Sequence, residues 1–325
     1  MKKIKTLGMT LVVISVLSLV FNGCDSSSDT TIPDKNNDIV LASLTKKWET
    51  KANLSVPESV IYDSNKKVIY ATNINSVGSG RVWKDNNGYI SKIDLNGIIL
   101  SKKWVTGLKA PKGLALSGEH LYAADNNTIV DINTSNGEIL NTFKAPDGTN
   151  HLNDLVYDKK TNLLYASDEQ DNQILKMSMD GTYSLYYAIK SSDNVYLNGL
   201  FVDGDKLVMQ GEKGFLKFID LNTKIVNTIS SNMEKVSIDG ICKYNSKGYL
   251  VSKVGDKIYF VNNEGASKAF SIQDPTRVAD ISYSSELGLL LAPDFKSRIR
   301  AYEVKIVIKK PNKNINKNES IKSQN

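Results

Sequence analysis

The chain is poor in the residues that mark several common protein classes. It has two cysteines, seven prolines and two histidines among 325 residues. Two cysteines cannot build a disulfide-stapled scaffold, and so little proline beside 21 glycines excludes collagen-like and low-complexity chains. The two histidines, His120 and His151, are too few for a histidine-rich zinc site. What is present, 41% hydrophobic and 23% charged residues, is the composition of a globular protein with a sizeable core.

The excess of positive charge lies outside the middle of the chain. Of the net charge of +6, residues 1–23 contribute +3 and residues 305–325 contribute +5, so residues 24–304 carry −2. Because nucleic-acid-binding domains concentrate positive charge on the folded part, we expect no nucleic-acid partner. The Lys/Asn-rich residues 305–325 are predicted to be a basic, disordered tail; contact of this tail with anionic lipid is the weaker alternative.

The N-terminus resembles a bacterial lipoprotein signal. Three lysines within the first five residues precede an apolar run, Leu7–Phe21, which is shorter than the roughly 20 residues of a membrane span. A glycine and Cys24 follow. The resemblance implies a signal peptide over residues 1–23, lipidation at Cys24, a flexible tether over residues 24–44, and a mature protein anchored in the bacterial cell envelope on its periplasmic or extracellular side. The alternative is a secretory signal with an incidental cysteine.

The middle of the chain repeats one pattern six times. Each copy opens with a short, largely apolar segment and continues with short strands separated by turns, such as Val68–Thr72 and Gly88–Asp94 in the first copy. The second positions of the six opening segments, called the ring positions below, are Glu58, Lys112, Asn153, Asn198, Asp239 and Ala279. Short strands in units of about 40–45 residues are typical of β-propeller blades.

We therefore predict an all-β, six-bladed β-propeller with four-stranded antiparallel blades over residues 45–304, and a monomer. No stretch shows helical periodicity over 10–12 residues, which argues against a two-domain α/β protein. The sixth unit ends after its third strand, at Val304. We predict that Lys46–Ala52 supplies the missing fourth strand, because closing the propeller in this way covers an open sheet edge.

The ring positions predict a polar site. The innermost strand of each blade lines the central channel of a propeller, so residues at the starts of these strands converge at one mouth. Four of the six positions carry oxygen donors, Glu58, Asn153, Asn198 and Asp239. Carboxylate and amide oxygens are the ligands that Ca²⁺, Mg²⁺ and Mn²⁺ prefer. Taken singly, each of these residues is equally typical of a turn cap.

This pattern resembles the gluconolactonase and senescence-marker-protein (regucalcin-like) lactonases, which are six-bladed propellers with one divalent metal. Their metal ligands are a Glu opening blade one, an Asn in an Asn-Asp pair of blade three, the Asn of an Asn-Gly in blade four and the Asp of an Asp-Gly in blade five. Glu58, Asn153, Asn198 and Asp239 match these positions. The resemblance implies hydrolysis of a sugar-type lactone or related ester, with Ca²⁺, Mg²⁺, Mn²⁺ or Zn²⁺ as cofactor and Asp239 as general base.

Further residues near the same mouth are candidates for substrate binding. His151 stands where the family's sugar lactonases commonly have Arg, and Lys112 places a cation at a ring position. The segment Asn75–Asn87 carries Arg81 and Trp83 and is predicted to be a lid or specificity loop. The alternatives are a loop histidine, an ion pair of Lys112 with a ring carboxylate, and a tolerated surface insertion.

Two functions remain open at this point. One is an exported, membrane-anchored, metal-dependent hydrolase that acts on a lactone or related ester. The other is a non-catalytic, NHL-like propeller that binds a glycan, peptide or protein. The hydrolase needs the ring positions and a metal, whereas the binding propeller would use the segment Asn75–Asn87 and the blade edges.

Overall fold

The computed structural model describes residues 39–75, 86–149, 151–189, 195, 197–211, 214–231, 233, 237–253, 257–270 and 277–309. The predictions for Cys24, Arg81 and Trp83 lie outside these residues, as does the signal segment. Among the residues that are described, no helix is long and apolar enough to cross a membrane.

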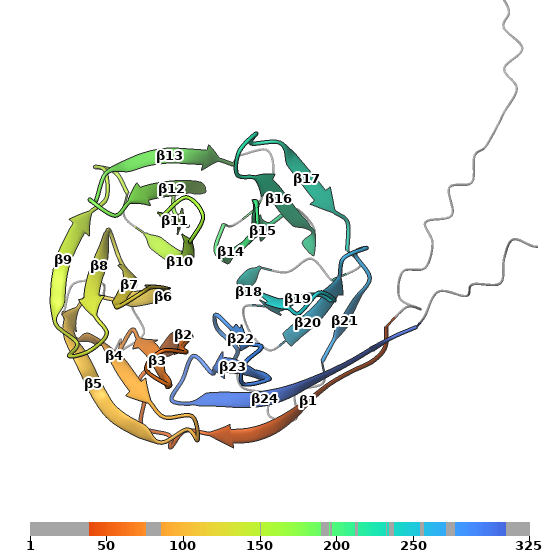
Figure 1. Cartoon of the computed structure of the whole chain (residues 1–325), viewed down its shortest axis with the longest axis horizontal. Coiled ribbons are helices and arrows are strands. Elements are labelled where there is room, and N and C mark those ends of the chain that lie inside the picture. Colours follow the sequence, from red (N-terminus) through yellow and green to blue (C-terminus); the bar gives the residue numbers. More distant parts are fainter. Residues whose placement is uncertain are drawn as a thin grey trace, which may run out of the picture. The chain divides into compact units, whose positions relative to one another are not determined.

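The described strands form six four-stranded antiparallel sheets arranged in a circle (Figure 1). Blade one contains β2 (Pro57–Asp63), β3 (Val68–Asn73), β4 (Gly88–Ile93) and β5 (Ile99–Leu108). Blade two contains β6 (Pro111–Ser117), β7 (His120–Asp125), β8 (Thr128–Asn133) and β9 (Ile139–Lys144). Blade three contains β10 (Leu152–Asp158), β11 (Leu163–Asp168), β12 (Gln173–Ser178) and β13 (Tyr183–Ala188).

The remaining blades follow the same order. Blade four contains β14 (Leu200–Asp203), β15 (Lys206–Gln210), β16 (Leu216–Asp220) and β17 (Val226–Ile229). Blade five contains β18 (Ile238–Tyr244), β19 (Gly248–Lys253), β20 (Lys257–Asn262) and β21 (Ser267–Ala269). Blade six contains β22 (Ser282–Ser284), β23 (Leu289–Pro293), β24 (Ile299–Ile308) and the N-terminal strand β1 (Ile39–Glu49). The predicted six-bladed propeller is confirmed.

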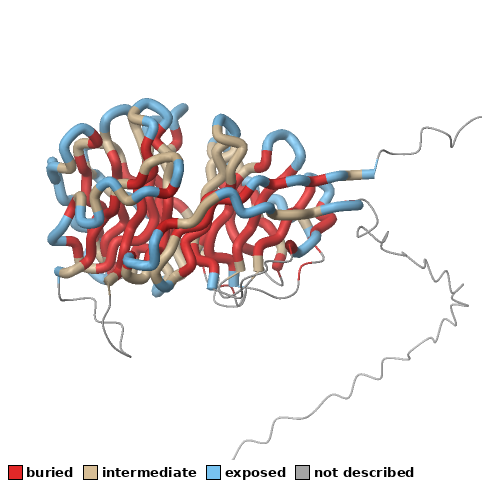
Figure 2. The backbone as a smooth tube through the Cα atoms, turned by 90° about the horizontal axis from the view of Figure 1, so that it is seen from below, coloured by how far each residue is buried: buried red, intermediate tan, exposed pale blue. Residues whose placement is uncertain are grey.

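The outermost strand of each blade is its most exposed strand. All six residues of β3 are buried, because neighbouring blades cover both faces of this strand. The outermost strand β9 is almost entirely exposed. Figure 2 shows exposed residues along the loops at the edge of the molecule and buried residues along the strands. The apolar clusters lie between blades: Tyr70 of blade one, for example, packs in one cluster with Leu121 and Val130 of blade two. The channel-lining strands are therefore held between blades on both sides.

The N-terminal strand closes the propeller, as predicted, although its bounds differ from the prediction. β1 is Ile39–Glu49 rather than Lys46–Ala52, and it pairs with β24 from Ile39↔Ile308 to Glu49↔Arg300. Residues 39–44 and 305–308, which the sequence pattern placed in the tether and the tail, belong to these two strands. The physical reason is burial: Ile39 and Ile306 pack into the core cluster of blades five and six, so pairing continues past Val304.

Candidate functional site

The ring positions lie at the starts of the innermost strands. Glu58, Lys112, Asn153 and Asp239 are the second residues of β2, β6, β10 and β18. In each of these four strands a bulge interrupts the pairing with the second strand of the blade. The interruptions fall between Pro57 and Val60, Pro111 and Leu114, Leu152 and Leu155, and Ile238 and Ile241. A bulge changes the direction in which a side chain points. The side chains of these four ring residues therefore need not follow the strict alternation of sides along a strand.

Hydrogen bonds connect the predicted residues at this mouth. The Asn198 amide donates Nδ2 to Asp239 Oδ1 at 2.8 Å. The Asn153 amide donates Nδ2 to Glu169 Oε2 at 3.0 Å, and His151 Nδ1 lies 3.1 Å from the same oxygen. Each amide thus commits its nitrogen to a carboxylate, which leaves its oxygen as an acceptor.

Glu169 is a site residue that the sequence reasoning missed. It follows β11 directly, in the turn between the second and third strands of blade three. Its contact with His151, followed by its bond from Asn153, lowers the pKa of Glu169 to about 2. A single oxygen of Glu169, Oε2, therefore contacts the side chains of both His151 and Asn153. Its place at this mouth could have been predicted, because turns between the second and third strands lie at the same mouth as the ring positions. Only the turn of blade one was considered.

Glu58 and Lys112 are buried together at the ring. Each is 3% exposed, and Lys112 Nζ donates to the Leu152 carbonyl at 3.2 Å. Burial, and then the charges of Asp239 and Asp280, raise the pKa of Glu58 well above its ordinary value, with Lys112 opposing them. Among the described residues, Glu58 Oε2 has no hydrogen-bond partner. Lys112 thus opposes the effect of burial and of the neighbouring carboxylates on the pKa of Glu58 without cancelling it.

Asp239 carries the second ring carboxylate. Burial raises the pKa of Asp239 to about 7, although the bond from Asn198 acts in the opposite direction. The sixth ring position, Ala279, is apolar, but its neighbour Asp280 donates its backbone N–H to the Glu58 carbonyl at 3.1 Å. Blade six thus contacts the site through its backbone.

Two glycines set how closely neighbouring blades approach here. A Cβ on Gly199 would lie 2.5 Å from the Asp239 carbonyl oxygen, and a Cβ on Gly240 would overlap Asp280 and the backbone nitrogen of Ile281. The Asn-Gly and Asp-Gly pairs therefore have a packing reason. The glycine after one ring residue makes room for the next blade.

The residues present fit a divalent cation. Glu58, Asn153, Asn198 and Asp239 offer hard oxygen donors, and the buried Glu58 oxygen lacks a donor among the described residues. No three His, Cys, Asp or Glu side chains in the described part of the chain could hold a metal together; the ring set takes two of its four donors from amides. Of the predicted substrate-binding residues, Lys112 and His151 lie beside these donors, and Arg81 and Trp83 lie outside the described residues.

Known proteins share the fold of this chain. No protein-family model matches the sequence, and no curated protein matches it. A streptogramin B lyase has a TM-score of 0.60 at 13% identity, covering 81% of this chain and 98% of the lyase. Virginiamycin B lyase from Staphylococcus aureus has a TM-score of 0.58 at 15% identity, covering 81% and 99%. A chain of a nidogen/laminin complex has a TM-score of 0.56 at 16% identity, covering 74% and 96%.

Proposed function

We propose that this propeller is a divalent-metal-dependent hydrolase that opens a lactone or cleaves a related ester at the ring mouth. The observation that carries the proposal is the buried Glu58 carboxyl group, whose Oε2 has no hydrogen-bond partner among the described residues. Burial, followed by the charge of Asp239, raises the pKa of Glu58 well above its ordinary value. A buried, poorly compensated carboxylate costs free energy unless a cation is bound. Such arrangements cluster at functional sites.

The residues divide the chemistry among them. A cation held by Glu58, Asn153, Asn198 and Asp239 would polarise the substrate carbonyl and acidify water. Asp239, oriented by the 2.8 Å bond from Asn198, takes the proton of the attacking water. Water oxygen bonds to the carbonyl carbon, the carbon–oxygen bond of the lactone breaks, and the proton passes to the leaving oxygen, giving a hydroxy acid.

Lys112 and His151 act on the substrate. The Lys112 ammonium lies close enough to Glu58 and Asp239 to affect the pKa of both, so it can stabilise the negative charge that develops on the carbonyl oxygen. Glu169 fixes the orientation of His151 through Nδ1. His151 then contributes to substrate binding, and Glu169 is a positioning residue.

The N-terminal resemblance supports the location of this activity. We propose that the mature chain is lipidated at Cys24 and held at the bacterial cell envelope. Fatty-acid labelling that survives Cys24→Ser would contradict this part of the proposal.

The second candidate function is a non-catalytic binding propeller, which Lys112 favours. If its buried ammonium is the permanent counter-charge of Glu58 and Asp239, the ring positions form a structural ion cluster. The similar structures include both lyases and a chain of a nidogen/laminin complex, so this fold is found in both settings.

Hydrolysis assays separate the two functions. Sugar lactones and simple esters are offered to the protein with Ca²⁺, Mg²⁺, Mn²⁺ or Zn²⁺. We expect ion-dependent turnover that Asp239→Asn lowers at least about a hundredfold, since general-base catalysis contributes that much. The matched control is Asp205→Asn, an exposed carboxylate paired with Lys160, which should retain activity. Turnover of no lactone or ester with any of the four ions, or full turnover by folded Asp239→Asn, would refute the hydrolase.

A further inference from the structure

A cavity of about 430 Å³ opens at the opposite end of the channel from the ring positions. It is lined by the innermost strands of all six blades and reaches Asn65 and Gly118, in the hairpins that follow β2 and β6. The ring residues lie at the starts of these strands, so the cavity occupies the other mouth. Its volume is within the range of small-molecule sites, about 300–1,000 Å³.

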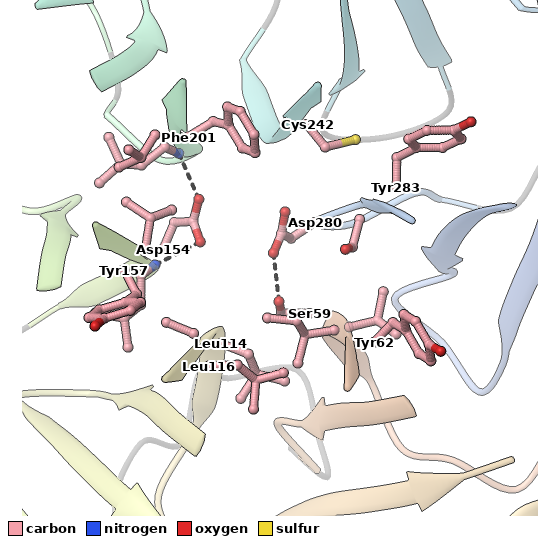
Figure 3. Close-up of a pocket in the computed structure, with 18 of the residues that line it drawn as sticks. Ser59, Tyr62, Leu114, Leu116, Asp154, Tyr157, Phe201, Cys242, Asp280 and Tyr283 are labelled. Atoms are coloured by element: carbon pink, nitrogen blue, oxygen red, sulfur yellow. Dashed lines mark hydrogen bonds between the residues drawn. The ribbon is translucent and has the colours of Figure 1, made fainter. Parts of the chain in front are cut away.

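The walls of the cavity combine polar and apolar groups. Three residues beyond each ring position, the strands contribute a layer that we call the collar: Ile61, Ala115, Val156, Phe201, Cys242 and Ser282. Five of these six residues are apolar. Tyr62, Tyr157 and Tyr283 surround the collar (Figure 3), and each remains partly exposed. Apolar and aromatic surface that is enclosed yet still accessible is typical of ligand pockets.

Two carboxylates form the inner end of the cavity. Asp154 and Asp280 extend toward the channel centre from opposite sides (Figure 3). Asp154 accepts the backbone N–H groups of Leu155 and Leu200 at 2.7 and 2.6 Å, and Asp280 accepts the Ser59 hydroxyl at 2.6 Å. These bonds fix both carboxylates, and each carboxylate oxygen has a second lone pair for a further donor.

The acidic and basic side chains that line the cavity are all carboxyl groups. Its lining includes Asp63, Asp154 and Asp280 but no Lys, Arg or His. Asp63 Oδ1 accepts the N–H groups of Asn65 and Lys66 in the adjoining hairpin, whereas Asp154 and Asp280 extend toward the channel centre. An organic ammonium supplies three donors for such a pair.

We propose that this cavity binds a small primary amine with an aliphatic or aromatic body. The ammonium lies between Asp154 and Asp280, and the body lies within the collar and against the tyrosines at the mouth. The proposal does not depend on hydrolysis at the ring positions, because none of the six ring residues lines the cavity.

A matched pair of probes tests the proposal. Isothermal titration at about pH 8.5, where an aliphatic ammonium is still charged and the carboxyl group of Asp154, with its pKa of about 7, is ionised, compares 2-phenylethylamine with 2-phenylethanol. The alcohol has nearly the same shape but no charge. We expect the amine to bind at least about tenfold more tightly, a difference of about 1.4 kcal/mol. In Asp280→Asn, which keeps the shape of the side chain, the two probes should bind equally weakly.

A variant that fills the cavity checks its location. Ser282→Trp introduces a large side chain at a partly exposed collar position and should abolish binding of both probes. Ser135→Trp, at an exposed turn outside the cavity, should leave binding unchanged. Equal affinity of the wild type for the amine and the alcohol, absence of amine binding, or amine binding that persists in folded Ser282→Trp would overturn the proposal. Ser282→Trp also keeps the test decisive if Asp280→Asn does not fold.

Discussion

The two ends of the channel are built from the same six strands, yet they differ in chemistry. At one end the ring positions bring together Glu58, Asn198 and Asp239, with Lys112 among them. Three residues further along each strand, the collar is almost wholly apolar. Repetition of one backbone unit thus fixes where side chains point, and the residue at each level fixes what that level can bind.

The largest effect is expected at the layer between the two ends. Gly240→Ala would push its new Cβ into Asp280 and the backbone of Ile281, so the two blades must separate. We expect a loss of about 3 kcal/mol in the free energy of unfolding, the upper range for overpacking. Chemical denaturation measures it. Gly204→Ala, where a Cβ meets open space but the φ of 60° is strained, should cost only about 1–2 kcal/mol. Equal costs would show that the blades do not depend on close approach.

The next prediction concerns the dependence of the free energy of unfolding on pH. Burial raises the pKa of Glu58, Asp154, Asp239 and Asp280, to about 7 for Asp154 and Asp239. In the unfolded chain the same groups titrate near pH 4. Between about pH 4 and pH 7 the folded state therefore holds more protons than the unfolded state, so the free energy of unfolding falls as pH rises.

Denaturation in the presence of a chelator measures this pH dependence. Glu169, whose pKa is lowered to about 2, loses its contribution only below this window. The slope should decrease in Asp239→Asn and on addition of a divalent cation, which replaces the protons. Stability that is constant or rises between about pH 4 and pH 7 would show that the carboxylates are compensated within the protein.

Much of the fold follows from the sequence, whereas the function of the site residues stays a prediction. The six repeats predict the blades, and the ring positions predict that Glu58, Asn153, Asn198 and Asp239 meet at one mouth. Glu169 was missed because it lies outside the repeating segment, in a turn between the second and third strands, and only the corresponding turn of blade one was considered. Asp154 and Asp280 were not predicted as a pair because the six copies were compared at the ring positions. These lie one residue earlier, and the sixth copy has Ala279 there.

The bounds of the closing strand show a different limit. The sequence analysis placed Ile39 in the tether and Ile306 in the tail, because neither residue belongs to a long apolar segment. Their burial depends on pairing between strands at opposite ends of the chain, Ile39↔Ile308 among them. Local sequence carries little information about such a pairing.

Binding of one divalent cation at the ring positions is the central claim, and calorimetric titration tests it most directly. Metal-free protein is titrated with Ca²⁺, Mg²⁺, Mn²⁺ and Zn²⁺, and the wild type is compared with Glu58→Gln and with the control Glu286→Gln, an exposed partner of Lys67. We predict one ion per chain for at least one of the four metals, with affinity at least about tenfold weaker in Glu58→Gln and unchanged in Glu286→Gln. No binding of any of the four ions, or equal binding by wild type and Glu58→Gln, would contradict the account.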